Sequence, residues 1–159
     1  MRQLWKGYLL MNPGLRGLAE WGISAAAGLL CIFTGSYKMV IFPVSLFIGA
    51  GLFTAGFIIH CISEKTHKQA RERAKEINKI IDTGMYTKIR HPLYLTMIMM
   101  NMGIGIGFGF AVTIGLGIVL SFLTVCTAIE EERFLLKTFS AEYRDYMARV
   151  QWRMIPGIF

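Results

Sequence analysis

The longest uncharged stretch of the sequence runs from Leu93 to Ile129. A helix needs about 20 mostly apolar residues to cross the roughly 30 Å hydrocarbon layer of a bilayer, so this stretch is nearly twice as long as one crossing requires. Glycines occupy alternate positions near its middle, from Gly103 to Gly109, and they favour a tight turn there. The stretch therefore predicts two short helices that form a membrane hairpin.

Two earlier apolar runs, Leu18–Gly35 and Met39–Cys61, are each long enough for one further crossing. The composition agrees, because 54% of the residues are hydrophobic and only 17% are charged, a balance that would cause a soluble domain to aggregate. We therefore expect an all-α, polytopic membrane protein. Residues 1–159 should form one membrane domain with about four transmembrane helices.

The basic residues are distributed unevenly between the ends of these runs. Of the 17 Lys and Arg residues, Lys38 alone lies between the first two runs, and none lies in the hairpin turn. Because Lys and Arg are retained on the cytoplasmic side, both termini and the connector 62–92 are predicted to be cytoplasmic. The net charge of +7 then indicates orientation and attraction to anionic lipid headgroups, not binding to nucleic acid.

The connector carries a helical pattern followed by two residues that end helices. Apolar side chains recur at spacings of three and four among charged neighbours, which predicts a surface helix over Ser63–Asp82. Gly84 ends that helix, and Pro92 prevents His91 from continuing one while suiting the first turn of the next. The sequence predicts a rigid elbow that presents Tyr86, Arg90 and His91 at the start of a membrane helix.

A second polar cluster, Glu130 to Arg133, follows the hairpin and begins a predicted cytoplasmic helix and tail over 130–159. An amphipathic pattern over Phe134–Val150 predicts that this helix continues out of the membrane. Both ends of a hairpin lie on one side of the membrane, so we expect the elbow and the glutamates to meet. An arginine fork suits a carboxylate or phosphate, and Glu131 or Glu132 suits an ammonium group or hydroxyls, so the pair would suit a zwitterion.

Taken in order, the residues around the elbow and after the hairpin resemble one family of membrane enzymes. The residues that carry the resemblance are Gly84, Tyr86, Arg90, His91, Pro92 and Tyr94, then Glu131, Glu132, Leu135, Phe139, Tyr143, Tyr146, Val150, Arg153 and Pro156. The pattern is similar to that of the isoprenylcysteine carboxyl methyltransferase and phospholipid N-methyltransferase family. It covers roughly residues 78–156, and the first two runs carry no such signature.

The resemblance implies methyl transfer from S-adenosylmethionine to a lipophilic, membrane-embedded acceptor at the cytoplasmic face. The acceptor would be an isoprenylcysteine-like carboxylate or a lipid amine headgroup, and no metal is implied. The resemblance places Arg90, His91 and Tyr94 at the methionine end of the donor and Tyr86 near its adenosine. Glu131 and Glu132 would hold the donor or orient the acceptor, and they are candidate catalytic residues together with Arg90.

The sequence departs from the family pattern at two places. Relatives often carry an arginine shortly before the glutamates, but Phe122–Ala128 has none, which leaves an amine, thiol or other lipid acceptor open beside a carboxylate. Ser140 stands where the family usually has glycine, and we expect it to act as a helix N-cap.

Two other functions fit parts of the sequence. The ending Arg153–Phe159 is similar to that of NADPH-dependent sterol reductases, although Pro92 and the glutamate pair match the methyltransferases better. Alternatively, the chain could be a non-catalytic membrane subunit in which Arg90 anchors the orientation and the tyrosines lie at the interface.

Overall fold

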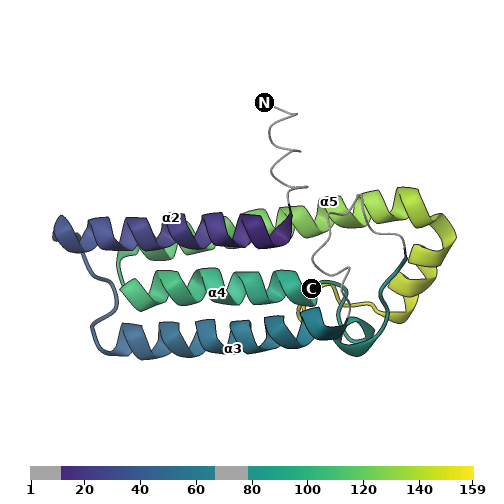
Figure 1. Ribbon diagram of the computed structural model, residues 1–159, viewed down its shortest axis with the longest axis horizontal. Coiled ribbons are helices and arrows are strands. Elements are labelled where there is room, and N and C mark those ends of the chain that lie inside the picture. The colour runs from purple at the N-terminus through teal and green to yellow at the C-terminus, as the bar shows by residue number, and fades with distance from the viewer. Residues whose placement is uncertain (1–11, 67–78) are drawn as a thin grey trace.

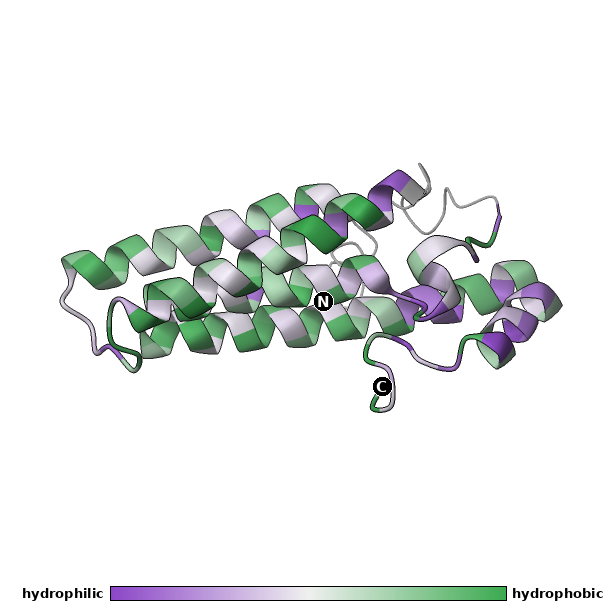
Figure 2. Cartoon of the chain, turned by 90° about the horizontal axis from the view of Figure 1, so that it is seen from below, coloured by the Kyte–Doolittle hydropathy of each residue, from purple (hydrophilic) through white to green (hydrophobic). Residues whose placement is uncertain are grey.

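The computed structural model describes residues 12–66 and 79–159, which form four long helices and no strand (Figure 1). The helices are α2 (Pro13–Phe33), α3 (Val44–Thr66), α4 (Pro92–Phe108) and α5 (Ala111–Arg149), and a short 3-10 helix, η3 (Gly84–Thr87), precedes α4. They run alternately up and down, so the start of α2, the end of α3 and the start of α4 share one end of the bundle. We call this the polar end, because polar residues gather around it (Figure 2). The predicted all-α fold is confirmed.

Three of these helices are long and apolar enough to cross a membrane, over Gly14–Phe33, Val44–Lys65 and Ala111–Arg149, and α4 is a shorter apolar helix. The first helix begins earlier than the predicted Leu18, because Asn12 caps it by accepting hydrogen bonds from the backbone of Gly14 and Leu15. The number of crossings and the side on which the termini lie remain predictions.

Glycines allow α3 and α4 to pack closely. A Cβ atom on Gly49 of α3 would lie 2.4 Å from the backbone of Gly107 in α4, which no side chain can occupy. The predicted turn of the hairpin lies at the end of the glycine series, where Gly109 adopts φ 75° and ends α4. Gly103, Gly105 and Gly107 lie inside α4 and serve packing instead of the turn.

The predicted surface helix Ser63–Asp82 is only partly described. Its first residues belong to α3, and 67–78 lie outside the described residues. Lys79 to Asp82 are not helical, contrary to the prediction. Tertiary contacts explain this difference, because Ile80 packs against the apolar cluster of α5 and Asp82 lies 3.3 Å from Arg149.

Helix α5 continues past the apolar run as predicted, and it kinks at Ser140 (φ 38°, ψ −100°). Beyond the kink the helix turns back toward the elbow (Figure 1). Its buried residues Leu135, Tyr143 and Tyr146 form one apolar cluster with Val150, which follows the helix directly. The N-cap interpretation of Ser140 is wrong, because an N-cap residue has an extended backbone whereas a positive φ favours glycine.

Candidate active site

The elbow is the rigid segment that runs through η3 to the start of α4. Gly84 begins it with φ 59°, and Pro92 starts α4 directly after His91, which has the non-helical angles φ −127° and ψ 62°. The backbone N–H groups of Arg90 and His91 donate to the carbonyls of Trp152 (2.9 Å) and Arg153 (2.8 Å). The elbow therefore lies beside the segment that follows α5, as well as at the start of α4.

Glu132 is the centre of the ionic contacts at the elbow. One carboxylate oxygen contacts Nε of Arg90 at 2.8 Å and Nε2 of His91 at 3.1 Å, and the other accepts from Nε (3.0 Å) and Nη2 (2.8 Å) of Arg153. Glu132 is only 4% exposed. Two guanidinium groups stabilise its ionised form and leave it few sites for a ligand.

Arg90 joins the elbow to the end of α5. Its Nη1 donates to the carbonyls of Val150 (2.8 Å) and Gln151 (2.7 Å), in addition to the bond from Nε to Glu132. Within the described part of the chain, its Nη2 has no hydrogen-bond partner. Arg90 lines a cavity, so this remaining nitrogen can serve a ligand while the others hold the fold.

Glu131 has a different environment from its neighbour. It accepts one hydrogen bond, from the hydroxyl of Tyr94 at 2.5 Å, and it is half-buried. No described residue donates to its second oxygen. Since Glu131 also lines the cavity, it presents a carboxylate oxygen that a ligand can reach.

The cavity lies at the polar end and has a volume of about 50 Å³. It is lined by tyrosine rings, by polar and charged groups, and by three aliphatic side chains. The lining residues are Lys79, Ile80, Ile81, Tyr86, Arg90, His91, Glu131, Leu135, Tyr143 and Tyr146. Burial first, and then the charge of Glu131, raises the pKa of the Tyr86 phenol well above its ordinary value. Tyr86 therefore remains protonated at neutral pH and can donate a hydrogen bond.

A buried polar network that the sequence patterns above do not predict adjoins this site. Arg16, which precedes the first predicted apolar run, is only 1% exposed. Its Nε lies 3.3 Å from Glu20, its Nη1 donates to Thr127 (2.6 Å), and its guanidinium carbon lies 5.4 Å from the centre of the Tyr94 ring. Asn101 donates to Glu20 at 2.7 Å. The network connects α2 to the residue that holds Glu131.

The i, i+4 spacing of Arg16 and Glu20 was the available signal. A carboxylate at the beginning of an apolar run needs a partner, and a basic residue one helical turn earlier is placed to supply it.

In residues 12–66 and 79–159, no group of three or more His, Cys, Asp and Glu side chains is placed to hold a metal ion.

A family model described as phospholipid methyltransferase matches residues 44–142, which is more than half of the chain. The chain belongs to the phospholipid methyltransferase family. The match includes α3, the elbow, α4 and α5 as far as Glu142, and so contains Arg90, His91 and both glutamates of the site. The resemblance inferred from the sequence is thus confirmed at the level of the family. Comparison with curated proteins gives no match to this chain.

Membership in the phospholipid methyltransferase family indicates a membrane methyltransferase that acts on lipid-type substrates. The apolar helices agree with a location in the membrane. The family model ends before Arg153, although this residue supplies two of the three guanidinium contacts to Glu132.

Proposed function

We propose that this phospholipid methyltransferase family member transfers a methyl group from S-adenosylmethionine to a lipid amine headgroup at the polar end of the bundle. The observation that carries the proposal is the cavity in which Glu131, Tyr86 and Nη2 of Arg90 retain hydrogen-bonding capacity beside tyrosine rings. The predicted orientation would place this reaction at the cytoplasmic face. We also expect residues 1–159 to act as one membrane domain.

The chemistry of the cavity fits the methyl donor, which is a zwitterion joined to an adenosine. When bound, the donor supplies an activated methyl group on a sulfonium, and the protein has to align it with the acceptor and exclude water. Arg90 and Lys79 provide positive charge for its carboxylate, and the rings of Tyr86 and Tyr143 provide flat apolar surfaces for its base. His91 lines the cavity and would complete the methionine end, as the family pattern implies. Tyr94 does not line the cavity and would act through its hydrogen bond to Glu131.

The volume of the cavity sets a condition on this proposal. At about 50 Å³ the cavity is much smaller than the roughly 300–1,000 Å³ of ordinary small-molecule sites. The donor therefore requires the segment Lys79–Ile81, which lines the cavity without helical structure, to move outward on binding.

The two glutamates have separate roles in the proposal. Glu132 is a positioning residue, because its oxygens are taken up by Arg90, His91 and Arg153. Glu131 contacts the substrates directly. Its negative charge attracts a cationic headgroup and opposes a carboxylate, which favours an amine over an isoprenylcysteine-like acceptor. For the transfer, the headgroup ammonium would first give a proton to the Glu131 carboxylate. The nitrogen lone pair would then form the bond to the methyl carbon as the sulfur–carbon bond breaks and its electron pair stays on sulfur.

Calorimetric titration of the purified protein in nanodiscs tests the choice of cofactor. We expect saturable binding of S-adenosylmethionine and S-adenosylhomocysteine and none of NADPH. Binding of NADPH alone would support the reductase alternative, and binding of none of the three would support a non-catalytic subunit. Glu131→Gln should weaken donor or acceptor binding, whereas Glu130→Gln should not, because Glu130 pairs with Arg133 on the surface.

Acceptor choice needs a second measurement, with a donor carrying an isotope-labelled methyl group. Vesicles that contain phosphatidylethanolamine should acquire the label in their headgroups, and a prenylcysteine in the same vesicles should not. Label on the prenylcysteine carboxylate alone would refute the amine acceptor while leaving the methyl donor intact.

A further inference from the structure

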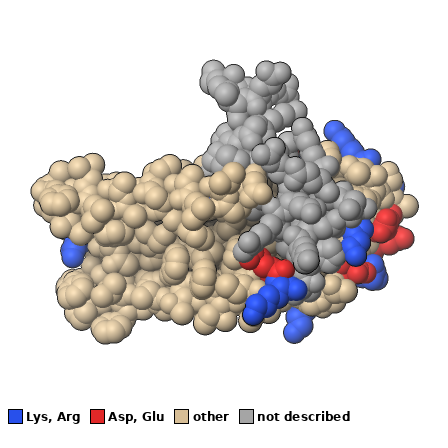
Figure 3. Space-filling view, viewed as in Figure 1, with Lys and Arg blue, Asp and Glu red and all other residues tan. Residues whose placement is uncertain are grey.

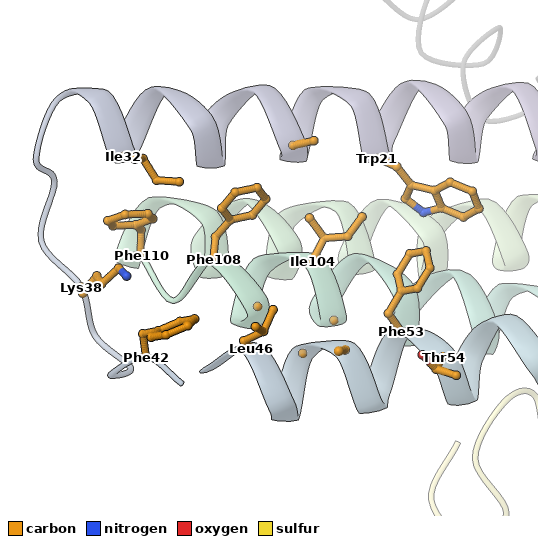
Figure 4. Close-up of a pocket in the computed structure, with 15 residues that line it drawn as sticks. Trp21, Ile32, Lys38, Phe42, Leu46, Phe53, Thr54, Ile104, Phe108 and Phe110 are labelled. Atoms are coloured by element: carbon orange, nitrogen blue, oxygen red, sulfur yellow. The ribbon is translucent and has the colours of Figure 1, made fainter. Parts of the chain in front are cut away.

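A second cavity lies between α2 and α3, away from the polar end. Helix α2 packs against α4 and α5, and α3 packs against α4, so that α4 forms the floor between them. The cavity has a volume of about 620 Å³, within the roughly 300–1,000 Å³ of sites that bind small molecules. Figure 4 shows side chains from α2, α3 and α4 around this space. We call it the α2–α3 groove.

The lining of the groove suits a hydrocarbon chain. Trp21 and Phe53 close its deep end, and Ile104 and Phe108 of α4 project between the two outer helices (Figure 4). Among the described residues that line it, Lys38 alone is charged. Apolar surface of this kind is stable when it is covered by apolar groups and not by water.

The length of the groove matches one leaflet of a bilayer. Trp21 and Ile32 line it on α2 and are eleven residues apart, which corresponds to about 16 Å along a helix. Half of the roughly 30 Å hydrocarbon layer is about 15 Å. A lipid chain that enters from the membrane surface therefore reaches from one end of the groove to the other.

Lys38 provides a positive charge at the mouth of the groove (Figure 4). The backbone holds it there, because Lys38 pairs with Phe110 and the next residue, Met39, donates to the carbonyl of Gly109 at 2.8 Å. Its ammonium lies 5.3 Å from the ring centre of Phe110 and 5.8 Å from that of Phe42. On the face shown in Figure 3, a single basic patch stands at this end, far from the other charges.

In the described part of the chain, no carboxylate pairs with Lys38. A lysine that lines an apolar groove of one-leaflet depth is complementary to an anionic group attached to a hydrocarbon chain. We propose that the α2–α3 groove binds an anionic phospholipid, with one acyl chain between α2 and α3 and the phosphate at the ammonium of Lys38.

This lipid is distinct from the methyl acceptor. The mouth of the groove lies at the opposite end of the bundle from Glu131 and the elbow (Figures 1 and 4). A lipid with its headgroup at Lys38 cannot present that headgroup to the candidate active site. The groove would therefore hold a bound lipid of the other leaflet, and its test needs no methyl donor.

Trp21 can report on the groove, since it lines the deep end. In a Trp5→Phe/Trp152→Phe background, Trp21 is the remaining tryptophan of the three in the chain. The full chain is placed in phosphatidylcholine nanodiscs that contain increasing fractions of phosphatidylglycerol with brominated acyl chains, which quench nearby tryptophan. Half-maximal quenching should need about fivefold less brominated phosphatidylglycerol than brominated phosphatidylcholine, the preference expected from one lysine at a membrane surface.

Matched variants separate the bound lipid from the general lipid shell. Lys38→Gln should abolish the fivefold preference and Lys38→Arg should retain it, while Lys65→Gln, at the polar end, should leave it unchanged. Ala25→Phe, which fills the groove, should reduce quenching at low lipid fractions, and Ala26→Phe, outside the lining, should not. Equal quenching by the two lipids in the background protein, or the same preference in Lys38→Gln, would overturn the proposal.

Discussion

Replacing each glutamate of the site by glutamine should separate their structural and ligand-binding roles. Glu132 accepts four hydrogen bonds from three cationic or ionisable side chains and is almost fully buried. In Glu132→Gln, the charge is lost and the amide would turn an N–H group toward a guanidinium. Breaking a buried ion pair in this way costs about 3–5 kcal/mol. For a chain of this length, the midpoint of thermal unfolding should fall by roughly 6–20 °C.

Glu131→Gln should behave differently, because Glu131 accepts one hydrogen bond from Tyr94 and glutamine keeps an oxygen for it. We expect a loss of about 1 kcal/mol or less, with weaker binding of the donor or acceptor. Thermal unfolding in a fixed detergent, followed by circular dichroism, measures the first effect, and calorimetric titration measures the second. Equal losses of stability in the two variants, or a larger loss in Glu131→Gln, would refute the division of roles.

Three further predictions concern the helices. Ser140→Gly should raise stability by roughly 0.5–1 kcal/mol, because φ 38° suits glycine; a lower unfolding midpoint would show that the kink is not strained. Gly49→Ala should lower stability by about 1–3 kcal/mol, since a Cβ atom there would lie 2.4 Å from the backbone of α4, whereas Gly51→Ala, with open space around it, should be nearly neutral. Glu20→Leu should cost about 3–5 kcal/mol, because it removes the carboxylate that lies 3.3 Å from the buried Arg16. The double variant Arg16→Met/Glu20→Leu should recover most of that loss in chemical denaturation. A double variant as unstable as the single one would contradict the pairing.

The outline of the fold could be predicted because it follows from the lengths of the apolar runs and from the residues that begin or end helices. Apolar runs of membrane length gave the helices, and Pro92 gave the start of α4 after the elbow. The exact turn of the hairpin could not be predicted in this way. Alternate glycines are compatible with a turn and with close helix contact, and only the position of Gly49 on a neighbouring helix decides between them.

Pairing at the site was less predictable than its location. Hairpin topology implied that Arg90 and the glutamates would meet, but not that Glu132 would bind two arginines while Glu131 would contact Tyr94. Successive helical residues point about 100° apart, so neighbouring glutamates have different partners. Arg153 belongs to the site through a segment without regular structure, for which sequence periodicity gives no signal.

The contacts of Arg90 also impose an order on the assembly of the protein. The carbonyls of Val150 and Gln151 that accept from its guanidinium lie 60 and 61 residues further along the chain, so the ribosome adds them long after the elbow. Until then Arg90 is a solvated cation beside a membrane helix, which is the form that directs the orientation of a nascent chain. The same side chain would thus act first in choosing the side of the membrane, and only later become buried in the finished site.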